Sequence, residues 1–140
     1  MTNNNLNIYM AKIQYTLHHA SLLVSNTQES LKFYVDTLGM EQTQRPDLPF
    51  PGAWLKVGKQ QIHLLELPSP DAKTGRPKHG GRDRHVAMTV ADITPVKQLL
   101  DDAGVEYTLS ISGRQALFCR DPDGNAIEII AEAELANMQD

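Results

Sequence analysis

Hydrophobic and polar positions follow the same order twice along this chain. In the first copy a strand-like run at residues 15–25 precedes a helical pattern at 27–38, and strand-like runs follow at 40–45, 53–57 and 61–67. In the second copy a strand at 84–90 precedes a helix at 93–104, and strands follow at 105–110, 114–119 and 126–131. The sequence therefore predicts an α+β fold made of two βαβββ modules.

Polar and small residues mark the ends of both predicted helices at equivalent places. Asn26 and Asp92 precede the helices as N-terminal caps, and Gly39 and Gly104 follow them. Because the two glycines are 65 residues apart, helix end aligns with helix end. We expect the modules to be copies of one structural unit.

The repeat sets the expected boundaries of a single domain at residues 13–132. Its modules span 13–67 and 83–132, and a linker rich in Pro, Gly and positive charge (68–82) joins them. This linker is either a solvated connector or a basic lid over an anionic substrate. We expect the polar residues 1–12 to be a disordered leader, with Met10 as an alternative start to Met1, and 133–140 to be a C-terminal tail.

Composition excludes several classes of function. The 140 residues carry a net charge of −4, which gives no electrostatic basis for nucleic-acid binding. No apolar stretch is long enough to cross a membrane and no signal peptide is evident, so we expect a cytoplasmic protein. Cys119 is the single cysteine and lies in an apolar run, which favours a buried structural thiol in a reducing compartment.

Four side chains that can bind metal recur at equivalent positions in the two modules. His19 and His85 are 66 residues apart, and His63 and Glu128 are 65 apart. Side chains alternate between the faces of a strand, so the isoleucines on both sides of Glu128 face the helix and Glu128 faces away. The same alternation places the three histidines on the face away from the helices.

Three imidazoles and one carboxylate suit a divalent metal such as Zn, Ni, Co, Mn or Fe(II). A metal would also explain a carboxylate in an otherwise apolar strand, where an unpaired charge is costly. We therefore expect His19, His63, His85 and Glu128 to be metal ligands. His18 is on the opposite strand face and His79 is in the linker, so both are left outside the site.

These segments resemble the vicinal oxygen chelate superfamily, the glyoxalase / bleomycin resistance protein / dioxygenase group. The motifs are LHHASLLVSNTQESLKFYVDTLGM, IHLLEL, RHVAMTVADI and DPDGNAIEII, spread over residues 17–130. The resemblance implies a half-open, curled mixed sheet around one divalent metal, with the four residues above as ligands. It also implies a homodimer in which the cavity is completed across the two chains. His63 departs from the Glu or Gln that glyoxalase I or methylmalonyl-CoA epimerase members carry there.

The resemblance leads us to expect a glyoxalase I-like lyase or isomerase acting on a small oxygen-chelating molecule, with a thiol conjugate as one candidate substrate. The metal would act as a Lewis acid and Glu128 as the base. The alternatives are an Fe(II) extradiol-type dioxygenase, thiol transfer as in fosfomycin resistance, and a non-catalytic ligand-binding protein of the bleomycin resistance type.

Residues that bind the substrate are not assigned by the sequence. Trp54 and Phe118 could line an apolar wall, although an ordinary core position is the simpler interpretation for each. Four arginines could meet an anionic substrate, at positions Arg45, Arg82, Arg84 and Arg114.

Overall fold

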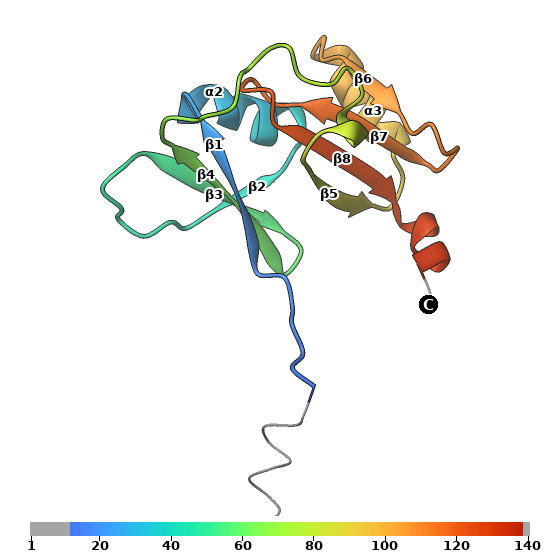
Figure 1. The fold of residues 1–140 in the computed structure, drawn as a ribbon, viewed down its shortest axis with the longest axis horizontal. Coiled ribbons are helices and arrows are strands. Elements are labelled where there is room, and N and C mark those ends of the chain that lie inside the picture. Colours follow the sequence, from blue (N-terminus) through green and yellow to red (C-terminus); the bar gives the residue numbers. More distant parts are fainter. Residues whose placement is uncertain (1–11, 139–140) are drawn as a thin grey trace, which may run out of the picture.

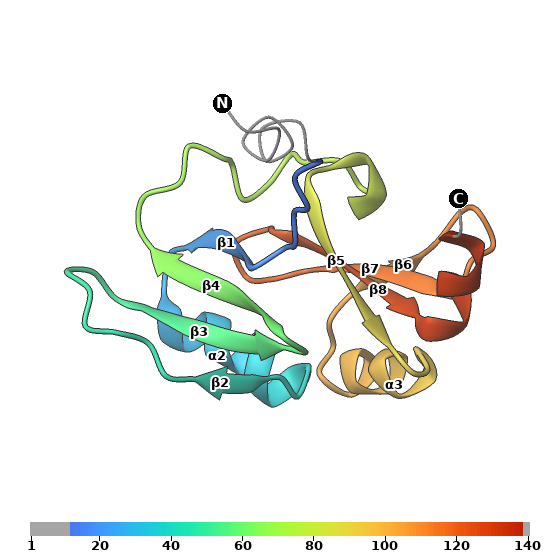
Figure 2. The same cartoon turned by 90° about the horizontal axis from the view of Figure 1, so that it is seen from below.

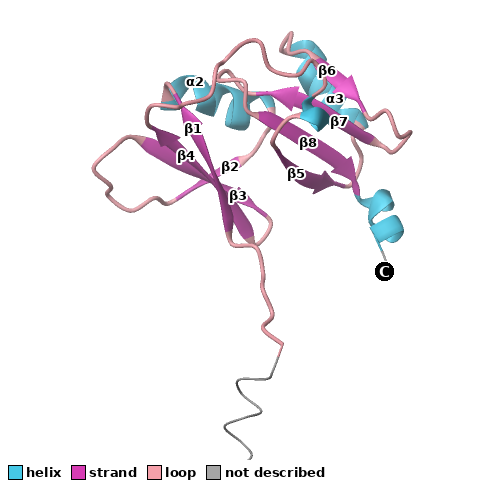
Figure 3. Ribbon diagram, viewed as in Figure 1, coloured by secondary structure: helices cyan, strands magenta, loops and turns pink. Residues whose placement is uncertain are grey.

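A computed structural model describes residues 12–138 as two four-stranded sheets, each with a helix against it (Figures 1 and 2). The first module comprises β1 (His19–Val24), α2 (Thr27–Leu31) with a π-helical continuation (Lys32–Thr37), β2 (Glu41–Thr43), β3 (Gly52–Val57) and β4 (Gln60–Glu66). The second comprises β5 (His85–Val90), α3 (Thr94–Asp102), β6 (Tyr107–Leu109), β7 (Ala116–Arg120) and β8 (Ala126–Ala131). Short 3-10 helices lie at Gly80–Arg82 and Glu132–Met138. The predicted α+β order is confirmed (Figure 3).

Both sheets have the same strand order and the same register. The orders are β1-β4-β3-β2 and β5-β8-β7-β6, in which the first two strands of each sheet run parallel and the others antiparallel. Ser21 pairs with His63 in the first sheet, and Ala87 pairs with Glu128 in the second. Because these pairs are equivalent, the repeat predicted from the sequence is a structural repeat.

The predicted first strand was too long. Residues 15–18 are extended but unpaired, and β1 begins at His19, whose ladder partner is Gln61. β4 begins at Gln60, directly after the turn at Gly58 and Lys59, so in this parallel register it reaches no further back than His18, whose carbonyl accepts from the N–H of Gln61. The predicted leader at 1–12 lies outside the described residues except for Lys12.

The hydrophobic core lies between the sheets and their helices. Strand residues that point towards the helices are almost fully buried, as at Leu64 and Ile127, and so are Tyr34 and Leu100 on the helical segments. Asn26 caps α2 as predicted, because its side chain accepts a hydrogen bond from the backbone N–H of Glu29. Ile93 holds the cap position of α3, while Asp92 accepts from the N–H of Thr94. The opposite face of each sheet is left for the predicted ligands.

A buried carboxylate joins the two modules. Asp121, in the turn between β7 and β8, accepts a 2.8 Å hydrogen bond from the hydroxyl of Tyr34 in the first module. It also accepts from Asn125, whose amide donates to the carbonyl of Leu23 in β1. Burial raises the pKa of both Asp121 and Tyr34. We call this network the Asp121 clamp.

A second charged cluster fixes the linker on the sheet of the second module. Asp83 accepts 2.8 Å hydrogen bonds from Arg76 in the linker and from Arg120 in β7. Arg120 also donates to the carbonyls of Pro77 and Gly124. Hydrogen bonds from the two arginines hold the pKa of Asp83 well below its usual range. The linker is therefore anchored, and its 3-10 turn packs on Phe118, where a side chain at Gly80 would meet that residue's Cβ at 3.2 Å.

Within residues 12–138, the structure contains no helix that is both long and apolar enough to cross a membrane.

The Asp121 clamp predicts that Tyr34→Phe lowers the free energy of unfolding by about 1–3 kcal/mol, because a buried carboxylate loses a donor. Urea denaturation measures this change. Tyr107→Phe is the matched control, since its hydroxyl meets Asp101 at 3.4 Å near the surface and should contribute below about 0.5 kcal/mol. Equal effects of the two variants would contradict the role given to the clamp.

The linker cluster predicts that Asp83→Asn lowers stability by about 1–3 kcal/mol at pH 7. The pKa of Asp83 is lower in the folded protein than in the unfolded chain, so its stabilisation is present above pH about 4 and is lost as the pH falls. Urea midpoints should therefore differ between wild type and variant at pH 7, and the difference should begin to narrow below pH about 4 without closing at pH 3, where the carboxyl is still largely ionised in the folded protein.

Trypsin provides a second measurement on the same variant. Cleavage after Lys78 and Arg82 should accelerate in Asp83→Asn, because the linker loses its anchor. Asp71→Asn, which removes an exposed ion pair with Arg84, should leave this cleavage rate unchanged.

Candidate metal centre

The first module presents two of the predicted ligands side by side. His19 is the first residue of β1, and its ring stacks on that of His63 in β4 with centroids 4.0 Å apart. Trp54 stacks on the other side of His63 at 3.9 Å, and Nε2 of His63 lies 2.8 Å from Oε1 of Gln61. Burial, followed by the neighbouring charges, lowers the pKa of His63. Its imidazole is therefore neutral at neutral pH, as metal binding requires.

In the second module the other two predicted ligands, His85 and Glu128, are in direct contact. Nε2 of His85 in β5 lies 3.1 Å from Oε2 of Glu128 in β8, and Nδ1 of His85 lies 2.8 Å from the carbonyl of Asp83. Since a carbonyl only accepts, Nδ1 carries a proton, and Nε2 faces the carboxylate either with a second proton or with its lone pair. The other carboxylate oxygen accepts a 2.7 Å hydrogen bond from Arg114. Either a proton on Nε2 or a cation would satisfy the carboxylate oxygen that faces it.

The chain brings the four residues together as two pairs. Within residues 12–138, no group of three or more His, Cys, Asp or Glu side chains is arranged to hold a metal ion. The Asp121 clamp explains why: it fastens the C-terminal end of β1 to the second module, whereas His19 is at the N-terminal end. Six residues of strand extend over about 16 Å, so the clamp does not draw His19 towards Glu128.

Two other histidines differ from their predicted surroundings. His18 precedes β1, where strand alternation no longer applies, and its Nδ1 lies 2.8 Å from Nδ1 of His19. His79 was expected to be solvated, but it packs on Phe118 with ring centroids 4.8 Å apart and bonds to the carbonyl of Leu109 at 3.2 Å. The anchored linker brings His79 there, which its position in a Gly-rich segment does not reveal.

Trp54 and Phe118 each contact one of the predicted ligands. Trp54 is half-buried on His63, and Phe118 is buried opposite Glu128 in the β7–β8 ladder, with its ring edge-on to His85 at 5.4 Å. Among the four arginines, Arg114 alone contacts a predicted ligand. Sequence spacing gave no signal for this contact, because Arg114 precedes β7 and is 14 residues from Glu128.

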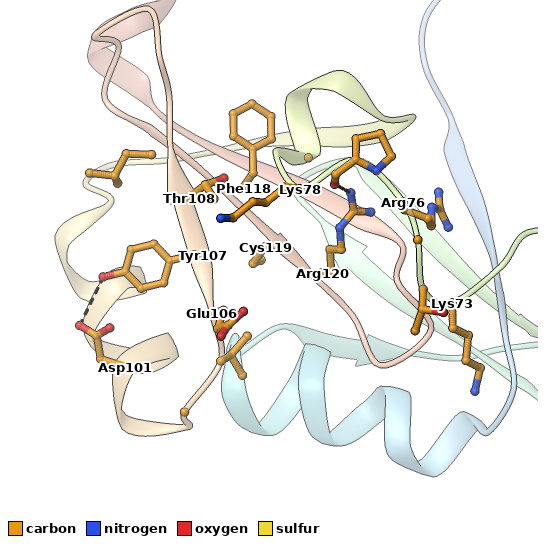
Figure 4. A pocket seen from close by; sticks show the side chains of 17 residues that line it. Lys73, Arg76, Lys78, Asp101, Glu106, Tyr107, Thr108, Phe118, Cys119 and Arg120 are labelled. Atoms are coloured by element: carbon orange, nitrogen blue, oxygen red, sulfur yellow. Dashed lines mark hydrogen bonds between the residues drawn. The ribbon is translucent and has the colours of Figure 1, made fainter.

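An open pocket of about 1190 Å³ lies next to the second pair, between the linker and β6 (Figure 4). Lys78, Arg76 and Arg120 line it near the linker, and Glu106 and Tyr107 line it near β6. Phe118 belongs both to this pocket and to the surroundings of His85. Phe118 is therefore shared by the pocket and the second pair, although His85 and Glu128 do not line the pocket.

Comparisons with known proteins agree with this geometry. The family model of the glyoxalase/bleomycin resistance protein/dioxygenase superfamily matches residues 16–129. Glyoxylase I 4 of Arabidopsis thaliana is 34% identical over 81% of this chain and 69% of its own length. Glutathione transferase FosA of Serratia marcescens is 31% identical over 81% of this chain and 79% of its own length.

Among solved structures, a glyoxalase family protein from Bacillus anthracis superposes with a TM-score of 0.70 at 27% identity, covering 86% of this chain and 97% of that one. Its likeness extends over both modules. The repeat, the fold and the matched sequence agree, and the chain belongs to the glyoxalase/bleomycin resistance protein/dioxygenase superfamily.

Proposed function

We propose that this protein is a metal-dependent, glyoxalase I-like lyase or isomerase that acts on a small oxygen-chelating substrate. The observation that carries the proposal is the pair of donor sets at equivalent positions, His19 with His63 and His85 with Glu128. Ordinary core histidines would not recur in this register on the open face of two repeated sheets. The name of the Arabidopsis thaliana relative supports the same class of reaction.

The proposed enzyme is a homodimer whose sites are shared. Each chain offers two separate donor pairs, so the first pair of one copy meets the second pair of another copy. A twofold axis then produces two identical centres from two chains. Each centre has the ligands His19 and His63 from one copy and His85 and Glu128 from the other.

The residues fit a divalent cation such as Zn, Ni, Co, Mn or Fe. The carbonyl of Asp83 accepts from Nδ1 of His85, so in the neutral ring the other nitrogen, Nε2, would be the one to bind a metal. Glu128 has an exposed fraction of 4%, and Nε2 of His85 faces its Oε2 at 3.1 Å. A cation between these two atoms would satisfy both.

When bound, the metal would polarise two neighbouring oxygens of the substrate as a Lewis acid. Glu128 is the carboxylate of the set and would remove a proton from the carbon next to those oxygens and return it at the neighbouring position. Arg114 donates to Glu128 and would hold the carboxylate in place during the transfer. Trp54 and Phe118 provide apolar walls that would exclude water.

The pocket beside Phe118 has room for the remainder of a larger substrate such as a thiol conjugate. Lys78 has no ion-pair partner within residues 12–138 and would meet an anionic group there. We also propose a cytoplasmic location, supported by the buried thiol of Cys119, whose pKa burial raises to about 12.

Three other activities remain as outcomes of the same experiments. An Fe(II) extradiol-type dioxygenase would use two of the histidines and Glu128 as ligands. Thiol transfer is the activity in the name of the Serratia marcescens relative. A bleomycin resistance-type protein would bind a ligand without a metal.

We expect protein purified without a histidine tag to contain one divalent metal per chain, measured by elemental mass spectrometry. With the metal restored, methylglyoxal and glutathione provide the first substrate test. Glu128→Gln should lower kcat by about 10²–10⁴ fold, because the neutral amide neither accepts the proton nor neutralises the metal. Glu41→Gln, on an exposed carboxylate in β2, should leave kcat and metal content unchanged.

Full turnover by Glu128→Gln would refute the assignment of the base. Bound metal without this activity would direct the search to dioxygenase or thiol-transfer substrates. A tight ligand complex in metal-free wild-type protein would instead favour the binding function.

A further inference from the structure

Residues 12–18 form an exposed arm ahead of β1. The arm is extended and runs away from both sheets (Figure 1). Ile13, Tyr15 and Leu17 have exposed fractions of 66%, 86% and 70%. Among the described residues, no backbone hydrogen bond reaches the arm before the carbonyl of His18, which accepts from Gln61.

The arm has the pattern of a half-buried strand but lacks a surface to cover it. Its apolar side chains alternate with Gln14 and Thr16, which is typical of a strand with one face against other residues. All three apolar side chains are on the odd-numbered positions, the same parity as His19 and Ser21 in β1. Continued as a strand, the arm would turn its apolar face to the side of the sheet that holds the candidate ligands.

A matching surface is present on β5. This strand is at the edge of the second sheet and pairs with β8 alone among the described strands, so its outer N–H and C=O groups are open to another strand. On its ligand-bearing face, Ala87 and Thr89 are exposed. These two side chains are small and at most weakly polar, so larger apolar side chains of an added strand could pack beside them.

The shared centre determines which copy can supply the arm. His19 is the first residue of β1 and His85 is the first residue of β5. When His19 of one copy and His85 of another bind one metal, the two histidines lie close together. The arm, which ends just before His19, and β5, which begins at His85, then lie next to the same metal. The arm can then run antiparallel to β5 of the second copy, with residue 17 opposite 87 and residue 15 opposite 89.

We propose that residues 12–18 add as an antiparallel strand to the open edge of β5 in a second copy of this chain. This inference rests on the shared centre of the proposed function. Tyr15 and Leu17 then become an apolar wall of the shared cavity, supplied across the dimer, beside Ala87 and Thr89. Main-chain hydrogen bonds stabilise the pairing, and the three apolar side chains set its face.

A triple variant with serine at Ile13, Tyr15 and Leu17 tests the role of the apolar face. Sedimentation equilibrium should show a dimer dissociation constant raised at least tenfold over wild type. The melting temperature of the isolated chain at low concentration should be unchanged, because the apolar side chains of the arm are largely exposed. The matched control, Gln14→Ser with Thr16→Ser, changes the opposite face and should dimerise as wild type does.

Cysteine cross-linking tests the location of the arm. Leu17→Cys and Ala87→Cys are prepared as separate proteins, loaded with zinc, mixed and oxidised, so a disulfide between them can only join two copies. Cys119 contributes little background, because it is 2% exposed. The control replaces Ala87→Cys by Leu109→Cys, an exposed position on β6 at the far edge of the sheet, and should give little cross-linking.

The outcomes separate this proposal from the one on which it rests. A metal-containing dimer that is unaffected by the triple variant, or that cross-links equally at Ala87→Cys and Leu109→Cys, overturns the arm and leaves the shared centre intact. Wild-type protein that is monomeric with zinc bound or absent overturns both.

Discussion

The buried carboxylate of Asp121 is the contact on which the arrangement of this protein depends. It accepts a hydrogen bond from the hydroxyl of Tyr34 in the first module and another from the side-chain amide of Asn125. The same amide donates to the carbonyl of Leu23 in β1. A carboxylate with an exposed fraction of 5% is costly unless such donors surround it. The segment DPDGN, which by its sequence is a strong β-turn, therefore also joins the two modules through the hydrogen bonds of Asp121 and Asn125.

The place of this joint has a functional consequence. Because it fastens the C-terminal end of β1, it does not hold the N-terminal end, with His19, against the second module, and the ligands stay in separate pairs. Separate pairs suit a site that is assembled only when two copies meet. Catalysis would then be coupled to dimerisation, and the exposed arm ahead of β1 lies where such a contact would begin.

The linker gives the second pair its surroundings. Asp83 holds two arginines through its side chain, while its carbonyl fixes the proton of His85. One residue thus connects the anchoring of the linker to the tautomer of a candidate ligand. The same anchoring brings His79 and the Gly80-Gly81 turn onto Phe118, which closes one side of the adjoining pocket.

The sequence by itself determined the repeat, the α+β order and the strand faces of His63, His85 and Glu128, because strand alternation and helix caps depend on neighbouring residues. Tertiary structure decided the rest. The Arg114–Glu128 contact and the position of His79 depend on contacts between residues that are far apart in the chain. The separation of the ligands into two pairs depends on how the two modules are held together. The beginning of β1 near His19 also needed the fold, since its parallel neighbour β4 begins at Gln60 and cannot pair with residues before His18.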